Sequence, residues 1–339
     1  MQIKRLLMIS TDRKIFEQDS TVRARQIEYA KEWDEVHIIV FSKKNSNIKE
    51  TVISKNCWAY STQSWSKFVY PFDAMRFGRF IIEKRGITEI TCQDASLTAM
   101  AGISLKKQFN IPLEIQVHED IGSPYFTYNI SNKIRKSLAL SHLLKADRIR
   151  VVSNRIRDYL IEKIGIDKNN IIVKPIAIDE EKIRNASIIG GADLHKKYIQ
   201  FEKIVLMASR LEKEKNIDLA IEAFAKVVEK IPKAGLVIMG SGSQKDKLEN
   251  LVKKSGLEKS VVFEGWQDNP FSYYKTCDCF LVTSRFEGYG LTLAEVKVAN
   301  DKGVGIIVST DVGIAKEIGV KVVGQDITEI SEDIIKNIS

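Results

Sequence analysis

Short apolar runs alternate with amphipathic stretches along the whole chain. In the first half, the strand-like runs span residues 6–10, 36–41, 89–92, 113–117, 148–152 and 171–173. The helical patterns between them span residues 22–33, 72–84, 97–109, 131–144 and 155–164. The alternation restarts in the second half with segments 204–208, 217–230, 235–239, 245–254, 260–263, 279–283, 291–298, 305–309, 314–318 and 327–338. Strand–helix alternation of this kind predicts parallel sheets that are covered by helices on both faces.

Two rounds of the alternation predict an α/β protein with two Rossmann-like domains. The expected boundary follows Lys174-Pro175-Ile176, which gives domains of residues 1–177 and 178–339. A charged stretch, 179–197, leads to the first strand of the second domain. Because no long Gly/Ser/Pro-rich linker separates the halves, we expect the domains to lie close together with a cleft between them. In such sheets, ligands bind in the loops at the carboxyl ends of strands.

Length and composition are those of a globular protein. The 339 residues, 44% of them hydrophobic, allow two domains of ordinary size. No apolar run reaches the roughly 18 residues of a membrane span. The first ten residues hold a four-residue apolar core followed by a charged segment, which is typical of a strand and not of a signal peptide. Four scattered cysteines favour a reduced, cytoplasmic protein, and Cys277 and Cys279 lack the two further nearby ligands that a metal would need.

The net charge of +8 is unevenly distributed. Residues 1–175 hold 29 Lys and Arg against 19 Asp and Glu, a net +10, whereas residues 176–339 hold 23 against 25, a net −2. A nucleic acid, an anionic membrane surface or an anionic acceptor would each fit the basic first half. A solvated basic face without a partner fits it equally well. The chain contains no zinc finger or RNP motif, so nucleic acid is the least favoured of these partners.

Two glutamates eight residues apart give the most informative pattern in the chain. Glu287 lies in a loop after an apolar run, and Glu295 lies about one turn into the helical pattern that begins near Leu291. A loop at a helix start offers backbone N–H groups at a positive helix end, which suits a phosphate or a sugar hydroxyl. Two carboxylates beside such a site are unfavourable unless they bind hydroxyl groups. A sugar nucleotide, with its diphosphate, ribose and hexose, meets both requirements.

Two cations follow the first strand-like run of the second half. Arg210 and Lys215 stand between that run and the next helical pattern, where a diphosphate would bind. Because Glu212 and Glu214 lie in the same segment, a charged surface loop is the alternative. The loop of Glu287, which belongs to the same predicted sheet, favours the diphosphate site.

A glycine pair and a histidine occupy two further strand ends. Gly240-Ser241-Gly242 resembles the start of a dinucleotide fingerprint, but Lys245 replaces the third glycine and the segment lies late in its domain. A nicotinamide site is therefore disfavoured, and a turn near a nucleotide or a plain turn both remain open. His118 ends the run 113–117 in a loop with two acids beside it, so a site role is expected. No Asp-x-Asp motif is present to hold a divalent cation.

Taken together, these segments resemble glycosyltransferase family 4, whose members have the two-domain GT-B architecture. The strongest match is Glu287-x7-Glu295, with residues 287–291 reading Glu-Gly-Tyr-Gly-Leu. The other matching segments are 209–211 with Lys215, 236–242, 265–266 and 276–283, and, in the first domain, 117–118 and 145–153. The match is specific over 204–296 and looser in the first domain.

The resemblance implies a retaining transferase that uses a nucleotide-diphosphate sugar and needs no metal or other cofactor. Arg210 and Lys215 would neutralise the diphosphate leaving group. Glu295 would accept hydrogen bonds from the ribose, Glu287 would face the donor sugar, and His118 would approach that sugar from the acceptor-binding first domain. The implied catalytic residues are thus His118, Glu287, Arg210 and Lys215. The implied donor-binding residues are Glu295, Gly288, Tyr289, Gly290, Leu291, Gly240, Gly242, Ser209 and Gly265.

The chain departs from the family pattern at three places. The glycine-rich loop expected after the first strand is replaced by the charged segment 11–20. The segment 296–305 is a few residues longer than usual and lacks the family's proline. The chain ends at Ser339, whereas the family usually has a further helix that crosses back onto the first domain.

We therefore expect a cytoplasmic glycosyltransferase, peripheral at the inner face of the membrane. Its basic first domain would bind a glycan or lipid-linked acceptor in cell-envelope polysaccharide or glycolipid synthesis. The alternatives are a catalytically silent sugar-nucleotide-binding partner subunit, a GT-B-fold epimerase or phosphorylase and, least favoured, a nicotinamide dehydrogenase. Retention of both glutamates and both cations argues against the silent subunit.

Overall fold

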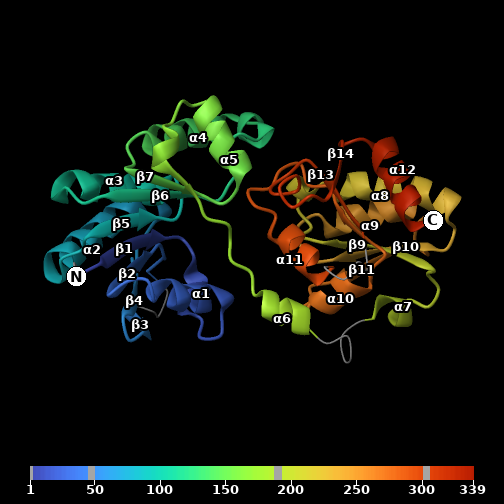
Figure 1. The fold of residues 1–339 in the computed structure, drawn as a ribbon, viewed down its shortest axis with the longest axis horizontal. Coiled ribbons are helices and arrows are strands. Elements are labelled where there is room, and N and C mark those ends of the chain that lie inside the picture. Colours follow the sequence, from blue (N-terminus) through green and yellow to red (C-terminus); the bar gives the residue numbers. More distant parts are fainter. Residues whose placement is uncertain (1–2, 45–49, 187–192, 301–305) are drawn as a thin grey trace. The chain divides into compact units, whose positions relative to one another are not determined.

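The structure, a computed structural model, describes residues 3–44, 50–186, 193–300 and 306–339. The chain forms two compact units, each built on a sheet of its own (Figure 1). The first unit contains Met1–Val152 and Ile156–Lys174, and the second contains Ser153–Arg155 and Pro175–Ser339. Apart from the short segment Ser153–Arg155, the chain passes from the first unit to the second between Lys174 and Pro175.

The first domain contains an eight-stranded sheet in the order β3-β4-β2-β1-β5-β6-β7-β8. Its strands are β1 (Arg5–Ser10), β2 (Glu35–Val40), β3 (Glu50–Ser54), β4 (Cys57–Ser61), β5 (Glu89–Cys92), β6 (Leu113–Val117), β7 (Arg148–Val151) and β8 (Ile171–Val173). Neighbouring strands are parallel except for β3, which runs antiparallel to β4. The hairpin of β3 and β4 is absent from the predicted strands.

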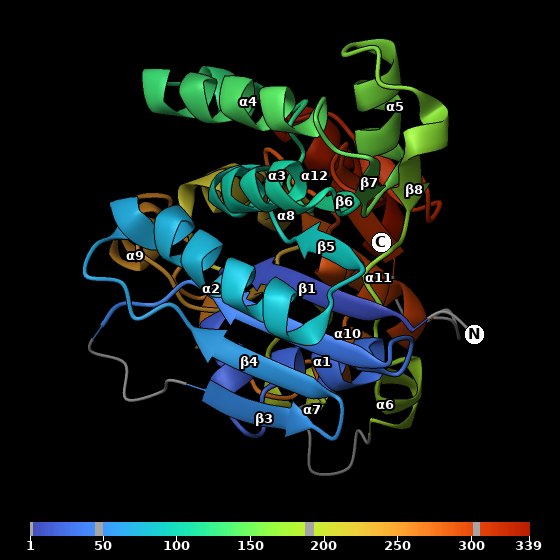
Figure 2. The same ribbon diagram turned by 90° about the vertical axis from the view of Figure 1, so that its left-hand side faces the viewer.

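Helices cover both faces of this sheet. They are α1 (Thr21–Ala30), α2 (Tyr70–Arg85), α3 (Leu97–Phe109), α4 (Ile130–Leu143) and α5 (Asn154–Glu162), with short 3-10 helices η1 (Arg13–Phe16), η2 (Lys67–Val69), η3 (Pro124–Thr127) and η4 (Lys168–Asn170). Helix α1 contacts β3 and β4, whereas α2 and α3 contact β1. Because the chain moves along the sheet in opposite directions before and after β4, the right-handed crossovers usual in such sheets put α1 on one face and α2 and α3 on the other. Helix α2 packs over β1 and β2, α3 packs beside it, and α4 contacts α3 (Figure 2).

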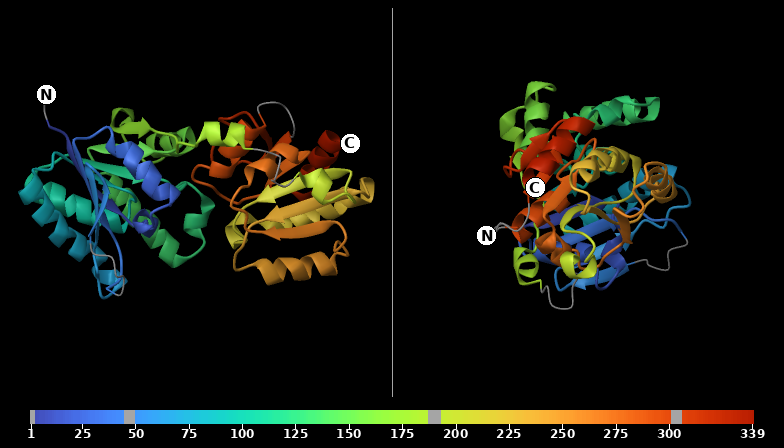
Figure 3. Two further views of the ribbon diagram at one scale, coloured as in Figure 1. Left: turned by 90° about the horizontal axis from the view of Figure 1, so that it is seen from below. Right: turned by 90° about the vertical axis from the view of Figure 1, so that its right-hand side faces the viewer.

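The second domain contains a six-stranded, all-parallel sheet in the order β11-β10-β9-β12-β13-β14. Its strands are β9 (Lys203–Ala208), β10 (Ala234–Met239), β11 (Val261–Gly265), β12 (Cys279–Val282), β13 (Ile306–Thr310) and β14 (Lys321–Val323). Its helices are α6 (Glu180–Asn185), α7 (Leu194–Lys197), α8 (Ile217–Lys230), α9 (Lys245–Lys254), α10 (Phe271–Thr276), α11 (Leu291–Ala299) and α12 (Ile327–Ile338), with η5 (Lys213–Lys215) before α8 (Figure 3). This order confirms the predicted Rossmann-like fold of the second domain.

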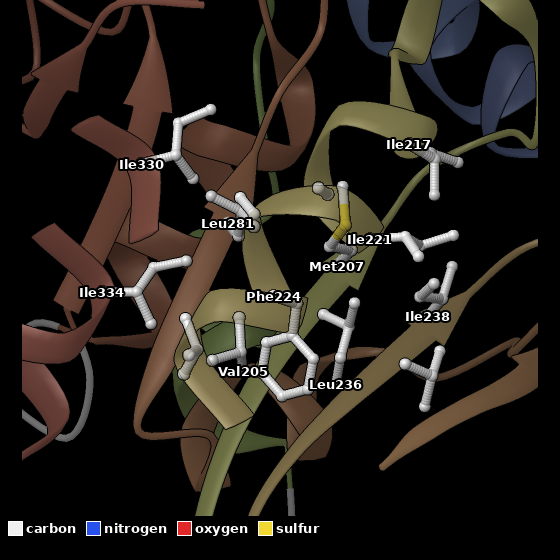
Figure 4. Close-up of a cluster of buried hydrophobic side chains, with 14 of the residues drawn as sticks. Val205, Met207, Ile217, Ile221, Phe224, Leu236, Ile238, Leu281, Ile330 and Ile334 are labelled. Carbon is white, nitrogen blue, oxygen red and sulfur yellow. The ribbon is translucent and has the colours of Figure 1, made fainter. Parts of the chain in front are cut away.

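The core of the second domain lies on both faces of its sheet. On one face, α8 and α12 pack against β9, β10 and β12, with Phe224, Leu281 and Ile330 among the buried side chains (Figure 4). On the other face, α10 and α11 bury Tyr274 and Leu293 against the same strands. Strands that are buried on both faces read as continuous apolar runs, which is why the sequence located them.

Two segments differ from, or lie outside, what the sequence pattern could be compared with in the structure. The stretch 314–318 forms turns and not a regular element, and the N–H of Ile314 donates to Tyr289 O of a neighbouring loop (2.9 Å). Part of the unusual segment 296–305, residues 301–305, lies outside the described residues. Within the described ranges, no helix is both long and apolar enough to cross a bilayer.

Candidate active site

The strand order of the second domain defines where a ligand would bind. From β9 the chain proceeds to β10 and β11 on one side, and from β12 it proceeds to β13 and β14 on the other. The loops that follow β9 and β12 therefore diverge and leave a crevice at their carboxyl ends, the usual ligand position in such sheets. The loop after β9 holds Arg210 and Lys215, and the loop after β12 holds Glu287.

An ion pair joins the two loops across this switch point. Lys215 Nζ lies 2.5 Å from Glu287 Oε1, and Ser284 Oγ donates a hydrogen bond to the same oxygen (2.9 Å). The side chains of Lys215 and Glu287 are 13% and 21% exposed, so the pair is largely shielded from solvent but still accessible to a ligand. The sequence placed both residues in one site, but it gave no sign that they contact each other, and it missed Ser284.

Further bonds fix the two loops to each other. The hydroxyl of Thr283 contacts the carbonyl oxygens of Lys215 (3.1 Å) and Asn216 (3.0 Å). Arg285 donates from its backbone N–H to Glu214 O (2.9 Å) and from Nε to Asn216 Oδ1 (2.9 Å). Lys215 is therefore held by its backbone as well as by its charge, and this preorganises its ammonium group at the switch point.

Arg210 occupies the outer part of the same loop. Its side chain is 65% exposed and forms an ion pair with Glu214 (2.9 Å). It therefore differs from Lys215, which is shielded and bridges the loops that follow β9 and β12. Arg210 is at the predicted strand end, but its ion pair is with Glu214 and not with Glu287.

The glycine pair of the next loop allows two backbones to meet. Gly240 has φ +132°, and a Cβ atom there would lie 1.8 Å from Ser209 O. Leu211 N donates to Ser241 O (2.8 Å), while a Cβ atom at Gly242 would lie 2.4 Å from Leu211 O. The segments 209–211 and 240–242 thus form one backbone unit that a side chain at either glycine would separate.

The predicted Gly265 belongs to the same edge of the sheet. It ends β11 with φ +76°, and its carbonyl oxygen accepts a hydrogen bond from Gly240 N (2.7 Å). The structure therefore brings Ser209, Gly240, Gly242 and Gly265 together at the carboxyl ends of three neighbouring strands.

The loop of residues 288–290 leads into α11. Gly290 takes φ +85° immediately before the helix, and its carbonyl oxygen accepts from the N–H groups of Leu293 (2.9 Å) and Ala294 (3.2 Å). The helix begins at Leu291, so its first N–H groups have no partner within the helix and face the loop. The backbone of Tyr289 packs closely against Gly313, since a Cβ atom at Gly313 would lie 2.2 Å from Tyr289 O.

Glu295 lies one turn into α11 and faces α10. Burial raises the pKa of its carboxyl group, while a hydrogen bond from the hydroxyl of Tyr274 lowers it. The pKa of Tyr274 is raised well above its ordinary value, first by burial and then by the nearby Glu295. One hydroxyl leaves most of the acceptor capacity of a carboxylate unused. Tyr274 escaped the sequence analysis because a buried tyrosine in an apolar helix resembles an ordinary core residue.

His118 belongs to the first domain and follows β6. Its ring is exposed at the surface, yet the packed surroundings and the charges of Arg150 and Arg25 lower its pKa to about 4. It is therefore neutral at pH 7. Nε2 lies 3.1 Å from Oε1 of Gln116, which is buried on the same face of β6.

The low pKa of His118 has a measurable consequence. Between about pH 4 and pH 6.5, the unfolded chain binds a proton that the folded histidine rejects, so the free energy of unfolding rises with pH across this window. His118→Asn is expected to reduce the loss of stability on going from pH 7 to pH 5. Denaturant titrations at both pH values measure it. Because burial also lowers the pKa of His37, part of the loss remains, and an unchanged loss in the variant would contradict the lowered pKa.

The segment that replaces the expected glycine-rich loop forms capping structure. Asp12 caps η1 through Lys14 N (3.2 Å), and Ser20 caps α1 through Arg23 N (3.1 Å). Ser20 therefore serves as the N-cap residue of α1. Among the described residues, no group of three or more His, Cys, Asp or Glu side chains is placed to hold a metal ion.

Comparison with known proteins identifies the class. Residues 27–182 match the family described as Glycosyltransferase Family 4, and residues 194–335 match the family described as Glycosyl transferases group 1. Together the two matches cover most of the chain, which belongs to the family 4 type of glycosyltransferases with the GT-B fold. The resemblance inferred from the sequence is confirmed.

Similar proteins of known name support this membership. Over 171 residues, 50% of the chain, it is 32% identical to the N-acetylgalactosamine-N,N'-diacetylbacillosaminyl-diphospho-undecaprenol 4-alpha-N-acetylgalactosaminyltransferase of Campylobacter jejuni, covering 44% of that protein. The chain spans less than half the length of the first curated relatives that it matches.

Solved structures share the fold at low sequence identity. The sucrose-phosphate synthase of Thermosynechococcus elongatus has a TM-score of 0.78 at 19% identity, with 98% of this chain and 89% of that chain covered. HepE of Anabaena in complex with UDP has a TM-score of 0.72 at 16% identity, with the same coverage. These likenesses confirm the predicted architecture of two parallel-sheet α/β domains.

Proposed function

We propose that the protein transfers a sugar, with retention of its anomeric configuration, from a nucleotide-diphosphate sugar to a glycan or lipid-linked acceptor. The observation that carries this proposal is the shielded Lys215–Glu287 pair at the switch point of the second sheet. A lysine held at this point can neutralise a diphosphate, and a carboxylate beside it can accept hydrogen bonds from a sugar.

The proposed roles follow from the positions of the side chains. Lys215 would move its ammonium group from Glu287 toward the departing diphosphate, with Arg210 adding charge from the exposed side. The N–H groups of 288–291 at the start of α11 would bind phosphate and sugar oxygens. Glu295 would accept from the ribose hydroxyls, and neutral His118 would hydrogen-bond the donor sugar.

The chemistry would need no metal in this scheme. Fixed cations and helix-end N–H groups would stabilise the charge that develops on the leaving phosphate, which is work that a metal does in other transferases. The leaving phosphate would accept the proton of the attacking hydroxyl on the same face of the sugar, which gives retention without a carboxylate nucleophile.

The nature of the acceptor is supported by relatives. The Campylobacter protein is named for a diphospho-undecaprenol acceptor, and the first domain here carries the basic half of the chain. We propose an acceptor of this lipid-linked or anionic class at the cytoplasmic face of the membrane, in cell-envelope polysaccharide or glycolipid synthesis.

A thermal-shift panel of nucleotide sugars tests the donor site. The matching donor is expected to raise the melting temperature of the parent by several degrees, because a ligand at 100 times its Kd adds about 2.7 kcal/mol of stability. Glu295→Ala is expected to lose most of this shift. The exposed Glu222 of α8 provides a matched control, since Glu222→Ala should keep the full shift. An equal shift in Glu295→Ala would remove Glu295 from the donor site.

A further inference from the structure

The helical layer of the first domain exposes large apolar side chains on its outer surface. In α4 they are Ile130, Ile134 and Leu138, and in and around η2 and α2 they are Trp65, Phe68, Phe72 and Phe80. Exposed fractions reach 88% for Phe68, 78% for Trp65 and 77% for Ile130. We call these seven side chains the outer apolar face. Single exposed apolar residues are ordinary, but clusters such as these, on two helices that both pack against α3, mark an interaction surface.

In α4, the apolar face is a regular stripe. Ile130, Ile134 and Leu138 follow one another at intervals of four residues, which places them along one side of the helix. The opposite side buries Ala139 and Leu143 toward the domain. The stripe is therefore additional to the side of α4 that packs on the domain.

The charged side chains of α4 and its immediate flanks have one sign. Residues 128–145 contain Lys133, Arg135, Lys136 and Lys145 and no Asp or Glu. Lys133 and Lys145 are exposed, and Arg135 extends to Glu119 of the neighbouring loop (3.2 Å). An apolar stripe bordered by cations suits the boundary between lipid headgroups and acyl chains.

The η2–α2 cluster repeats this combination with aromatic residues. Between residues 65 and 80, the basic residues are Lys67, Arg76 and Arg79, all exposed. The one acid, Asp73, accepts a hydrogen bond from the buried Ser64 (2.6 Å) and forms an ion pair with Arg76 (3.5 Å), so the segment has a net charge of +2. Tryptophan and phenylalanine beside basic residues favour a membrane interface.

We propose that the outer apolar face binds the surface of a bilayer that contains anionic lipid. Insertion of the apolar side chains would remove them from water, and the surrounding Lys and Arg would bind lipid headgroups electrostatically. A second copy of this chain is a less suitable occupant, because a symmetric contact would bring the same cations together. The proposal is consistent with a lipid-linked acceptor. Only this connection to the acceptor rests on the proposed function.

Vesicle co-sedimentation tests the proposal. Vesicles of equal parts phosphatidylcholine and phosphatidylglycerol should retain the protein at low salt, and phosphatidylcholine alone should retain it roughly tenfold less. Ile134→Ser with Leu138→Ser, and Phe68→Ser with Phe72→Ser, should each weaken retention, and the four together should reduce it to the level of neutral vesicles. Ile199→Ser, at an exposed isoleucine of the second domain, should change nothing.

The outcomes that would overturn the proposal are separable from loss of transferase activity. Absence of retention on anionic vesicles, or undiminished retention of the fourfold variant, would overturn it. A concentration-dependent dimer that the fourfold variant abolishes would replace the bilayer by a second copy. Vesicle binding needs neither donor nor turnover, so failure here leaves the thermal-shift test of the donor site intact.

A polar face of the first sheet carries a second, independent inference. Along β6, Glu114, Gln116 and His118 point to one side, and Thr91 of β5 lies between them. Gln116 Nε2 donates to Thr91 Oγ1 (2.8 Å), and Thr91 Oγ1 donates to Glu114 Oε1 (3.0 Å). Arg148 Nε donates to the other oxygen of Glu114 (2.8 Å), which keeps this carboxylate an acceptor.

The direction of every bond in this relay follows from Glu114. Because the Thr91 hydrogen goes to Glu114, the Thr91 oxygen must accept from the Gln116 amide nitrogen. The amide oxygen of Gln116 then faces Nε2 of His118 (3.1 Å) and can only accept. We infer that Thr91 and Gln116 are positioning residues that hold the Nε2–H tautomer of His118. Nδ1 is thereby left as an acceptor for a hydroxyl of a bound ligand.

Nitrogen NMR of the histidine ring tests the relay. In the parent, His118 should show the Nε2–H tautomer, assigned by the signal that His118→Asn removes from the spectrum. Thr91→Val should produce a mixture of tautomers and a several-fold lower kcat, whereas Thr91→Ser, which keeps the hydroxyl, should restore both. An Nδ1–H tautomer in the parent, or an unchanged tautomer in Thr91→Val, would refute the relay without touching the proposed donor site.

Discussion

Lys215→Ala is expected to lower the rate of glycosyl transfer by about 10²- to 10³-fold, the usual cost of removing one fixed group that stabilises transition-state charge. The side chain of Lys215 is 13% exposed; Glu287 holds its charge at the switch point, and the hydroxyl of Thr283 donates to its backbone carbonyl oxygen. Its loss also leaves the Glu287 carboxylate unpaired beside an incoming diphosphate. The two negative charges would then repel each other.

The matched control for this prediction is Lys213→Ala. Lys213 is exposed, lies two residues away and is part of the same η5 turn. Single-turnover measurements of sugar transfer should show full activity in Lys213→Ala and the large loss in Lys215→Ala. Lys215→Arg should retain part of the activity, since it keeps the charge but changes the geometry. Activity of Lys215→Ala within threefold of the parent would remove the ion pair from the mechanism.

Gly240→Ala is expected to lower the free energy of unfolding by about 3 kcal/mol or more, from the strained backbone conformation together with the steric conflict. Gly240 has φ +132°, and its new Cβ atom would meet the carbonyl oxygen of Ser209 at 1.8 Å. The neighbour is backbone and cannot rotate away. The loop of Ser209 and Arg210 would therefore be displaced from the strand end.

Gly256→Ala separates backbone conformation from steric conflict. Gly256 also has a positive φ, +68°, but no heavy atom of the described residues lies within 4 Å of the position that a Cβ atom would take there. The substitution should cost only about 1 kcal/mol. Denaturant titration of both variants, followed by donor thermal shift, gives the comparison. Equal costs for the two variants would show that the 240–242 loop does not need its close approach to Ser209.

Much of the fold could be predicted because its strands are buried on both faces. Helix α8, strand β5 and strand β6 begin and end where the apolar pattern placed them. The β3–β4 hairpin was missed because many side chains of the edge strand β3 and of its neighbour β4 are exposed or half-buried, which weakens the apolar signal.

The residues of the candidate site were predictable one by one, but their contacts were not. Lys215 and Glu287 are 72 residues apart along the chain, and only the order of β9 and β12 brings them together. The partner of Glu295, Tyr274, comes from another helix. One further pattern in the sequence indicates the polar face behind His118. Polar residues stand at every second position of β5, β6 and β7, such as Gln116 within β6.

The proposed diphosphate site is tested by a calorimetric titration of nucleoside diphosphates into the protein in the presence of EDTA. The parent should bind at least one of UDP, GDP, ADP and dTDP, Lys213→Ala should bind it equally well, and Lys215→Ala should bind it roughly tenfold more weakly, the effect of losing one charge-assisted contact. Absence of binding by the parent at millimolar concentration, or equal affinity in Lys215→Ala, would contradict a diphosphate site at the ends of β9 and β12.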